Sequence, residues 1–423
     1  MREEFLHYLW RLKRFDLTEL KTTEGTPIDL LKVGEHNHHA GPDFTDARIK
    51  IGDTTWAGNV EIHLNSSDWH RHGHHLDAAY QNVILHVVLE EDEVIRLENG
   101  ERLPCLELKK RVPGKLSGNY LQLLHNESWI PCEPQIETVP DIKINLWYDR
   151  LLVERLENKT GIIKHRLQQN NNDWEETFYQ LLARSFGSKV NADPFEQLAR
   201  STPLRIINKH RNNLLQIEAL LFGQSGLLEE DFQDDYPQRL QKEALFLRKK
   251  YGLKPLQKVQ WKYMRMRPAN FPSLRIAQLS SLLFSSAHLF SKVLAANNLK
   301  ELEQLFDLKL SFYWYNHYRL DRPSIRRAKN LGIPTIHSLI INTIVPFLFY
   351  YGQTRDDEHY KNKALQLLES IQPEDNHIIK KWQSLGLTPC SAAQTQALLQ
   401  LKNHYCNKKR CLECAIGHCI LSG

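Results

Sequence analysis

The segment from Gly41 to His63 constrains the fold of this chain more than any other. Residues 43–51 place three apolar side chains on one face of a strand, because alternate residues of a strand point the same way. Gly52-Asp53 follows as a turn signal, and residues 55–64 have the composition of a second strand. The pattern therefore predicts a hairpin whose two strands lie side by side in a sheet.

Three polar residues occupy this hairpin at related positions. Asp43 begins the first strand, and Glu61 and His63 lie two residues apart on the second, so their side chains share a face. Pairing of the strands brings all three to one edge of the sheet. Two carboxylates with a third polar group suit a hard divalent cation such as Mg²⁺ or Mn²⁺, which could support hydrolysis of a phosphodiester.

Further elements around the hairpin predict a small α/β sheet. Residues 3–14 have helical periodicity, and residues 27–34 are expected to form a strand ahead of the hairpin. A short helix is expected over residues 76–81. Residues 83–89 are almost continuously apolar, as in a strand covered on both faces, and a last strand is expected at 103–108. The predicted order is helix, three strands, helix, then strand.

This order, with Pro42-Asp43 before one strand and Glu61-x-His63 on the next, resembles the core of the PD-(D/E)xK nuclease superfamily. The resemblance covers the N-terminal quarter of the chain and implies a restriction-endonuclease-like fold. It further implies that Asp43 and Glu61 bind Mg²⁺ and that the third position orients or activates the attacking water. The superfamily has Lys at that position. His63 can accept a proton or bind a metal but lacks a fixed positive charge, so the site is catalytic, altered or inactive.

Nearly the whole chain resembles a bacterial family known as domain of unknown function 2851. The resemblance is carried by GPDFTDARIKI, by AGNVEIHLNSSDWHRHGHHLDAAYQNVILHVV and by NKKRCLECAIG near the C-terminus. This resemblance implies no activity.

Composition sets the broad class. A chain of 423 residues has room for two or three domains, and 25% charged with 41% hydrophobic residues is ordinary for a soluble protein. The net charge of +5 permits a nucleic-acid partner. Met1 leads directly into an amphipathic helix rather than a signal peptide. The longest apolar stretch, residues 339–351, is expected to be too short and too polar to span a bilayer, so we expect a cytoplasmic protein without a membrane partner.

Five of the seven cysteines fall within residues 390–419. The spacing of Cys406, Cys411 and Cys414 predicts a metal site for Zn²⁺ or an iron–sulfur cluster, with Cys390 as the fourth ligand. Cys419, His404 and His418 are alternatives for that place, and unligated reduced thiols are the alternative to any metal. The loop within this motif carries Lys408, Lys409 and Arg410, which could contact a phosphate backbone or simply face solvent.

A histidine-rich loop, residues 67–77, follows directly after the second hairpin strand. Neutral imidazoles and carboxylates in one loop suit Zn²⁺ or Mn²⁺, so Asp68, His72 and Asp77 are expected to orient a metal or substrate. Alternatively, several of them cap the short helix that follows. Glu4 on the first helix could add another carboxylate.

Residues 139–423 have helical periodicity throughout, so the chain is expected to be α+β: an α/β nuclease-like domain at 1–138, then an α-helical domain carrying the cysteine motif. Within the helical part, the segment 264–275 has three arginines and two prolines. Arg265, Arg267 and Arg275 could grip an anionic backbone, or form an interhelical connection that pairs with the acidic residues 229–235.

These patterns favour a metal-dependent nuclease acting on DNA or RNA, with Asp43, Glu61 and His63 as catalytic residues. Two other functions stay open. One is a nucleic-acid-binding module that has lost catalysis together with the Lys. The other is an unrelated transition-metal enzyme that uses the histidines and carboxylates.

Overall fold

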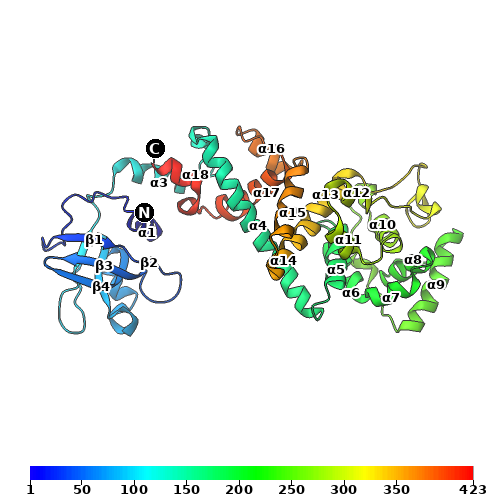
Figure 1. Cartoon of the computed structure of the whole chain (residues 1–423), viewed down its shortest axis with the longest axis horizontal. Coiled ribbons are helices and arrows are strands. Elements are labelled where there is room, and N and C mark those ends of the chain that lie inside the picture. The colour runs from blue at the N-terminus through cyan, green and yellow to red at the C-terminus, as the bar shows by residue number, and fades with distance from the viewer. Residues whose placement is uncertain (423) are drawn as a thin grey trace. The chain divides into compact units, whose positions relative to one another are not determined.

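The computed structural model describes residues 1–422 and divides the chain into two compact units (Figure 1). The first unit contains Met1–Trp147 together with the chain from residue 401 on, and the second contains Tyr148–Gln400. A mixed sheet occupies the first unit and helices dominate the second, so the expected α+β class is confirmed.

The sheet of the first unit is built around the predicted hairpin. Its path runs β1-β3-β4-β5-β6, and β2 pairs with the start of β3. Neighbours among β1, β3 and β4 are antiparallel, whereas β5 is parallel to β4 and β6 is parallel to β5. The strands are β1 (Ile28–Lys32), β2 (Glu35–His36), β3 (Phe44–Ile51), β4 (Thr54–Asn65), β5 (Val83–Glu90) and β6 (Cys105–Glu107).

Local sequence explains the two best-defined features of this sheet. Gly52 has a φ of +61°, a conformation that glycine adopts without steric cost, and it turns the chain from β3 into β4. The first six residues of β5 are all buried, as expected for a strand covered on both faces.

Helix α1 (Glu3–Arg11) packs against β4 through Phe5, Leu6, Leu9 and other buried residues. The crossover from β4 to β5 contains α2 (Asp68–Arg71) and the 3₁₀ turns η1 (His74–Leu76) and η2 (Ala78–Tyr80), not the single helix expected over 76–81. Gly73, with φ +76°, ends the chain turn that follows α2. The Asp77 carboxylate caps η2 by accepting a hydrogen bond from Ala79 N.

The C-terminal segment belongs to the first unit rather than to the helical region in which the sequence pattern placed it. It contains the π-helical turn η9 (Leu401–Cys406), the 3₁₀ turn η10 (Cys411–Glu413) and α18 (Ala415–Ser422). Helix α18 lies against α3 (Gly114–His125), and Asn119 Nδ2 donates to Ile420 O at 2.9 Å (Figure 1). Such contacts join residues about 300 positions apart, which a local pattern does not reveal.

The second unit is a helical array around one hydrophobic core. Helix α4 (Asp141–Gln169) starts in the first unit and continues into the second. The remaining α-helices are α5 (Trp174–Phe186), α6 (Ala192–Ser201), α7 (Leu204–Ile207), α8 (Leu214–Gln224), α9 (Asp235–Tyr251), α10 (Pro272–Ser285), α11 (Leu289–Ala295), α12 (Leu299–Gln304), α13 (Ile333–Leu339), α14 (Val345–Arg355), α15 (Glu358–Ser370), α16 (His377–Gln383) and α17 (Ala392–Gln400). The short strands β7 (His317–Arg319) and β8 (Arg322–Pro323) form a separate hairpin.

Helices α13 and α14 are joined by a π-helical turn, η8 (Ile340–Ile344), into one apolar run of 23 residues. The sequence pattern predicts a stretch here too short to cross a membrane, whereas this run is long and apolar enough by length and composition. Its most apolar window is 61% buried inside the protein, as in a core helix. The wider π turn precedes Pro346, whose ring and missing N–H disfavour a regular α-helical turn.

Candidate functional site

Asp43 and Glu61 meet at the edge of the sheet, as the hairpin predicts. Asp43 directly precedes β3, and pairing of Phe44 with Val60 brings it beside Glu61 on β4. Asp43 N donates to Glu61 Oε2 at 3.1 Å, and Ile62 N donates to Asp43 Oδ2 at 3.1 Å. The two backbone bonds hold both carboxylates in place, and Glu61 is only 4% exposed.

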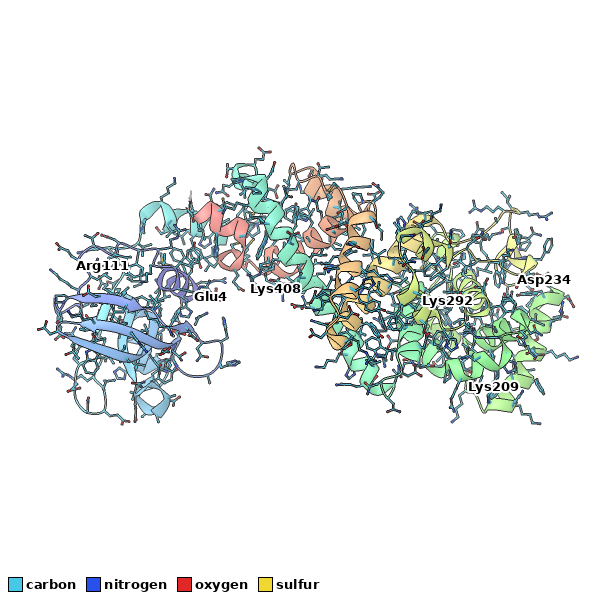
Figure 2. The ribbon with its side chains drawn as sticks, in the orientation of Figure 1. Glu4, Arg111, Lys209, Asp234, Lys292 and Lys408 are labelled. Atoms are coloured by element: carbon cyan, nitrogen blue, oxygen red, sulfur yellow. The ribbon has the colours of Figure 1, made fainter. Side chains whose placement is uncertain are left out.

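Helix α1 adds two side chains that the sequence pattern does not single out. His7 Nε2 lies 3.1 Å from Asp43 Oδ2 and 3.7 Å from Glu3 Oε1, and Glu3, His7 and Asp43 are close enough to share one metal ion. We call these three residues the carboxylate group. Glu4, the predicted contributor, is exposed on α1 (Figure 2). The sequence feature that could have indicated these two residues is the four-residue spacing of Glu3 and His7, which puts both on one helix face.

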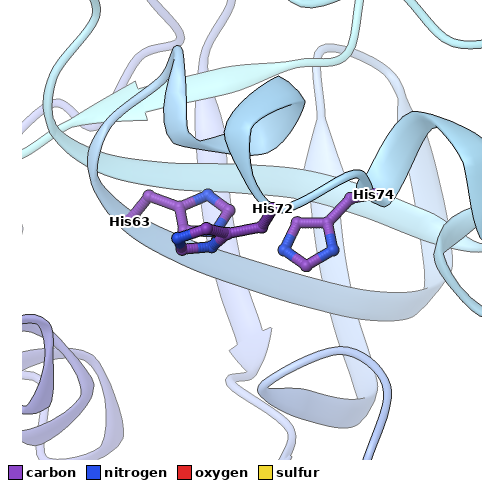
Figure 3. Close-up of side chains that lie close together, drawn as sticks. All are labelled: His63, His72 and His74. Atoms are coloured by element: carbon purple, nitrogen blue, oxygen red, sulfur yellow. The ribbon is translucent and has the colours of Figure 1, made fainter.

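A second cluster, which we call the imidazole group, consists of His63, His72 and His74 (Figure 3). His63 projects from β4, His72 follows α2, and His74 begins η1. The His63 Nε2 atom lies 3.2 Å from His72 Nδ1, and the rings of His63 and His74 stack with centroids 5.2 Å apart. One ligand nitrogen from each residue could bind a common ion.

Glu61 lies between the two groups. Its Oε2 accepts from Asp43 N on the carboxylate side, while its Oε1 lies 3.4 Å from His63 Nε2 and 3.2 Å from His74 Nε2. The carboxylate is therefore shared by an oxygen-rich and a nitrogen-rich set of donors.

Burial holds the acids of this site toward their protonated forms. It raises the pKa of Glu61, and the Asp43 carboxylate raises it further. Burial, together with Asp43, raises the pKa of Glu3 to about 7. Burial lowers the pKa of His7, but the adjacent Asp43 carboxylate outweighs this and the net shift is upward. Clustered acids that repel one another are the arrangement that a cation relieves.

Two histidines on the other side of Glu61, His63 and His86, have lowered pKa values and are neutral. Burial and the neighbouring imidazoles lower the pKa of His63 to about 2, and burial lowers that of His86 to about 3. His86 is a fully buried residue of β5 whose Nε2 lies 2.9 Å from His63 Nδ1, as a hydrogen-bonded core residue does. Neutral imidazole is the form that binds metals.

Two buried nitrogens of the site lack a hydrogen bond. His7 Nε2 and His74 Nε2 each lie near a carboxylate oxygen, but neither makes a bond of acceptable geometry. An unsatisfied buried nitrogen is costly unless something else binds it. The donors present thus fit a hard cation at the carboxylate group and a transition metal at the imidazole group.

Of the predicted supporting residues, only His72 joins the site. Asp68 Oδ2 accepts from Asn65 N at 3.2 Å and its Oδ1 pairs with Arg71 at 2.8 Å, so Asp68 organises the turn after β4. Asp77 caps η2 and lines a cavity of about 660 Å³. His74 lines the same cavity, which opens a route from solvent to the imidazole group.

The predicted cysteine ligands belong to both units. Cys390 is an exposed residue of the second unit whose backbone N–H bonds to Gln394. Cys406, Cys411 and Cys414 belong to the first unit, which also contains the buried Cys132. Cys132 lies 274 positions before Cys406, and no local spacing connects them.

The predicted nucleic-acid contacts differ in exposure. Arg265, Arg267, Lys408 and Lys409 are exposed. Arg275 is only 4% exposed and bonds to Gln278, Asn270 and Thr335, so it anchors α10 internally and is not a surface contact.

The other two basic residues of the C-terminal loop are bound to the protein. Lys409 donates to Leu124 O at 2.7 Å, and Arg410 pairs with Glu413 and donates to His404 O. Their side chains thus stabilise the loop that carries the cysteines.

Comparison with known proteins identifies the family of this chain but gives no activity for it. No curated protein and no solved structure matches the chain. The sequence model of the family described as "Protein of unknown function (DUF2851)" matches residues 3–377, which include the carboxylate group, Glu61 and the imidazole group. The chain therefore belongs to the DUF2851 family.

Proposed function

We propose that this protein is a metal-dependent nuclease that hydrolyses phosphodiester bonds of DNA or RNA. The observation that carries the proposal is the interlocked pair Asp43 and Glu61 at the sheet edge, with Glu3 and His7 supplied by α1. Glu3, His7 and Asp43 lie close enough to share one ion, Glu61 is bonded to Asp43 N, and burial raises the pKa of Glu3 and Glu61. A structural ion pair would not need two carboxylates held against each other.

The topology of the sheet supports the same proposal. An antiparallel path β1-β3-β4 is followed by a crossover to a parallel strand, β5, and α1 precedes the sheet. This is the element order in which the sequence resembles the PD-(D/E)xK superfamily, with Asp43 before one strand and Glu61 on the next.

Asp43 and Glu61 would hold Mg²⁺ or Mn²⁺, with Glu3 and the Ile62 carbonyl oxygen as further ligands. Such a cation supplies Lewis-acid stabilisation of the charge that develops on the phosphoryl oxygens. In the hydrolysis, a water oxygen bonds to phosphorus, the bond from phosphorus to a sugar oxygen breaks, and the water proton ends on that leaving oxygen. His7, beside Asp43, is placed to accept or return a proton during this exchange.

His63 has a different role from a Lys at that position. Its imidazole is neutral, and both ring nitrogens lie within 3.2 Å of another imidazole, His86 on one side and His72 on the other. It therefore positions Glu61 and the histidine loop rather than supplying positive charge.

A second candidate function rests on the imidazole group. Three imidazoles with Glu61 form the nitrogen-rich donor set that Zn²⁺, Mn²⁺ or iron prefers, and His74 lines a cavity of about 660 Å³ that could admit a substrate. In this alternative the protein is a transition-metal enzyme whose substrate enters beside His74.

A cleavage assay with matched variants tests the proposal. Wild type, Glu61→Gln and Glu4→Gln would be incubated with linear duplex DNA, single-stranded DNA and RNA, with Mg²⁺, Mn²⁺ or chelator. Glu4 is the matched control because it is on the same helix as Glu3 but is exposed. We expect metal-dependent cutting by wild type and by Glu4→Gln, and none by Glu61→Gln.

Other outcomes discriminate between the alternatives. Tight binding of nucleic acid without cutting, by folded wild type loaded with metal, would indicate the non-catalytic binding module. One transition metal per chain that is absent from His72→Ala, with no nucleic-acid cleavage under any condition, would favour the transition-metal enzyme.

A further inference from the structure

Four free cysteines lie on contacting elements of the first unit, and none of them belongs to the sheet-edge site. Cys132 precedes the 3₁₀ turn η3 (Glu133–Thr138), Cys406 ends η9, Cys411 begins η10, and Cys414 precedes α18. Cys132 and Cys414 are buried, at 8% and 7% exposure, and the other two are partly buried. We call these residues the cysteine group.

Contacts between the segments hold the group together. Lys402 on η9 donates to Trp129 O, and its ammonium lies 4.4 Å from the centroid of the Trp129 ring, three residues before Cys132. Lys409 donates to Leu124 O at 2.7 Å. Helix α18 also contacts η3 directly. The loop before Cys132 and the C-terminal loop are therefore bonded on both sides of the thiols.

Backbone packing around the group is tight. A Cβ on Gly417 would lie 2.0 Å from Cys411 O, so only glycine allows η10 and α18 to approach this closely.

We infer that Cys132, Cys406, Cys411 and Cys414 bind one structural metal centre, either Zn²⁺ or an iron–sulfur cluster. Four thiolates form the closed ligand set of structural zinc sites and of iron–sulfur clusters, with no position open for a substrate. The centre joins the C-terminal segment to the loop before α4, closing a unit built from the two ends of the chain. It is independent of the sheet-edge site, because it shares no ligand with it.

Metal analysis of the full chain tests the inference. Protein expressed with zinc and iron supplements would be purified without oxygen and assayed for zinc, iron and acid-labile sulfide. Zinc without sulfide, or iron with sulfide and visible absorption, both support the site and identify its occupant. Changing a residue that only supports a metal ligand already costs roughly 10–100-fold in affinity, so Cys132→Ser and Cys406→Ser should cost at least as much. Cys390→Ser, Cys419→Ser and Glu61→Gln should retain this metal.

A readout on wild type keeps the test valid if Cys132→Ser fails to fold. Thiol alkylation mapped by mass spectrometry should label Cys390 at once, and label the cysteine group only after the metal is removed. The inference is overturned by protein that holds neither zinc nor iron, by a disulfide within the group, by full metal retention in Cys132→Ser, or by equal metal loss in Cys390→Ser.

Discussion

Each unit of the protein buries a glutamate, and the surroundings of the two differ. In the helical unit, Glu218 on α8 is 1% exposed and accepts hydrogen bonds from three side chains: from Ser311 Oγ and Tyr236 Oη at 2.6 Å, and from Trp314 Nε1 at 3.3 Å. In the sheet unit, Glu61 accepts one backbone bond and faces Asp43, while His74 Nε2 beside it has no hydrogen bond.

Burial raises the pKa of both carboxyl groups, so the direction of the shift does not distinguish them. Their partners do. The donors around Glu218 satisfy its oxygens. Their hydrogen bonds stabilise the packing of α8 against Phe312–Tyr315, the aromatic 3₁₀ turn η7 that precedes β7. Glu61 accepts one backbone hydrogen bond, but the Asp43 carboxylate repels it and His74 Nε2 beside it lacks a hydrogen bond of good geometry. A bound cation would relieve both conditions, so we expect Glu218 to have a structural role and Glu61 to belong to a binding site.

The largest expected effect is on the cleavage rate, and it should separate the amide variants of the two buried glutamates. Glu61→Gln should reduce metal-dependent cleavage by at least roughly 100-fold, the scale reached when one electrostatic stabiliser of a transition state is removed. Glu218→Gln should leave the rate unchanged, because it contacts only structural donors. Rates measured at saturating metal check both. Equal losses in the two variants would show that the comparison does not separate function from structure.

Stability should respond in the opposite order. Glu218→Ala leaves Ser311, Tyr236 and Trp314 without their acceptor and should lower the free energy of unfolding by about 2–3 kcal/mol. Glu61→Gln in chelator removes a buried charge that the Asp43 carboxylate repels, so the free energy of unfolding should stay the same or rise. Urea titrations followed by circular dichroism measure both changes. A larger loss in Glu61→Gln than in Glu218→Ala would contradict this interpretation of the two networks.

Metal affinity at the sheet edge should depend on pH through Glu3. Its pKa, raised from 4.5 to about 7, means that the folded protein without metal binds a proton there below pH 7. A metal must displace that proton, so the affinity for Mn²⁺ should fall by about tenfold per pH unit below 7 and level off above it. Glu3→Gln should flatten this dependence. Calorimetric titration at several pH values, with Glu4→Gln as control, tests which carboxylate of α1 belongs to the site.

Acid should destabilise the sheet unit through its neutral histidines. His63 and His86 have pKa values of about 2 and about 3 in the fold, lowered from 6.5, so below pH 6.5 the unfolded chain binds more protons. Their contribution is complete above pH 6.5 and is lost progressively as pH falls toward about 3. His86→Gln should reduce the slope of stability against pH, measured in chelator by urea unfolding. The exposed His165→Gln should leave that slope unchanged.

The smallest effect is expected from the exposed arginines of the helical unit. Replacing Arg265 and Arg267 by Ala should weaken nucleic-acid binding uniformly. The slope of log affinity against log salt concentration should become shallower by about one for each phosphate that the variant no longer binds. Arg275→Ala should instead lower stability without changing the salt slope, because that side chain is buried. Fluorescence anisotropy at several salt concentrations separates the two results.

Local pattern predicted much of the sheet and part of its site. Alternation, the Gly52-Asp53 turn and the apolar run at 83–89 each depend on neighbouring residues, and all three features are present in the structure. The closeness of Asp43 and Glu61 was predicted from the pairing of the two hairpin strands. Glu3 was missed in favour of Glu4, because choosing between adjacent helix positions requires knowing which helix face packs on the sheet.

By itself, the sequence determined the α+β class, the hairpin with its two carboxylates and the presence of a cysteine motif, since each is encoded within a few dozen residues. Tertiary structure decided which distant groups lie with the predicted ones: His7 from α1 lies beside Asp43, and Cys132 shares the first unit with Cys406, Cys411 and Cys414. It also decided that Cys390 lies in the second unit and that Arg275, predicted as a nucleic-acid contact, is buried. The physical reason is that periodicity reports which face of an element is buried, whereas ligand sets depend on which buried faces meet.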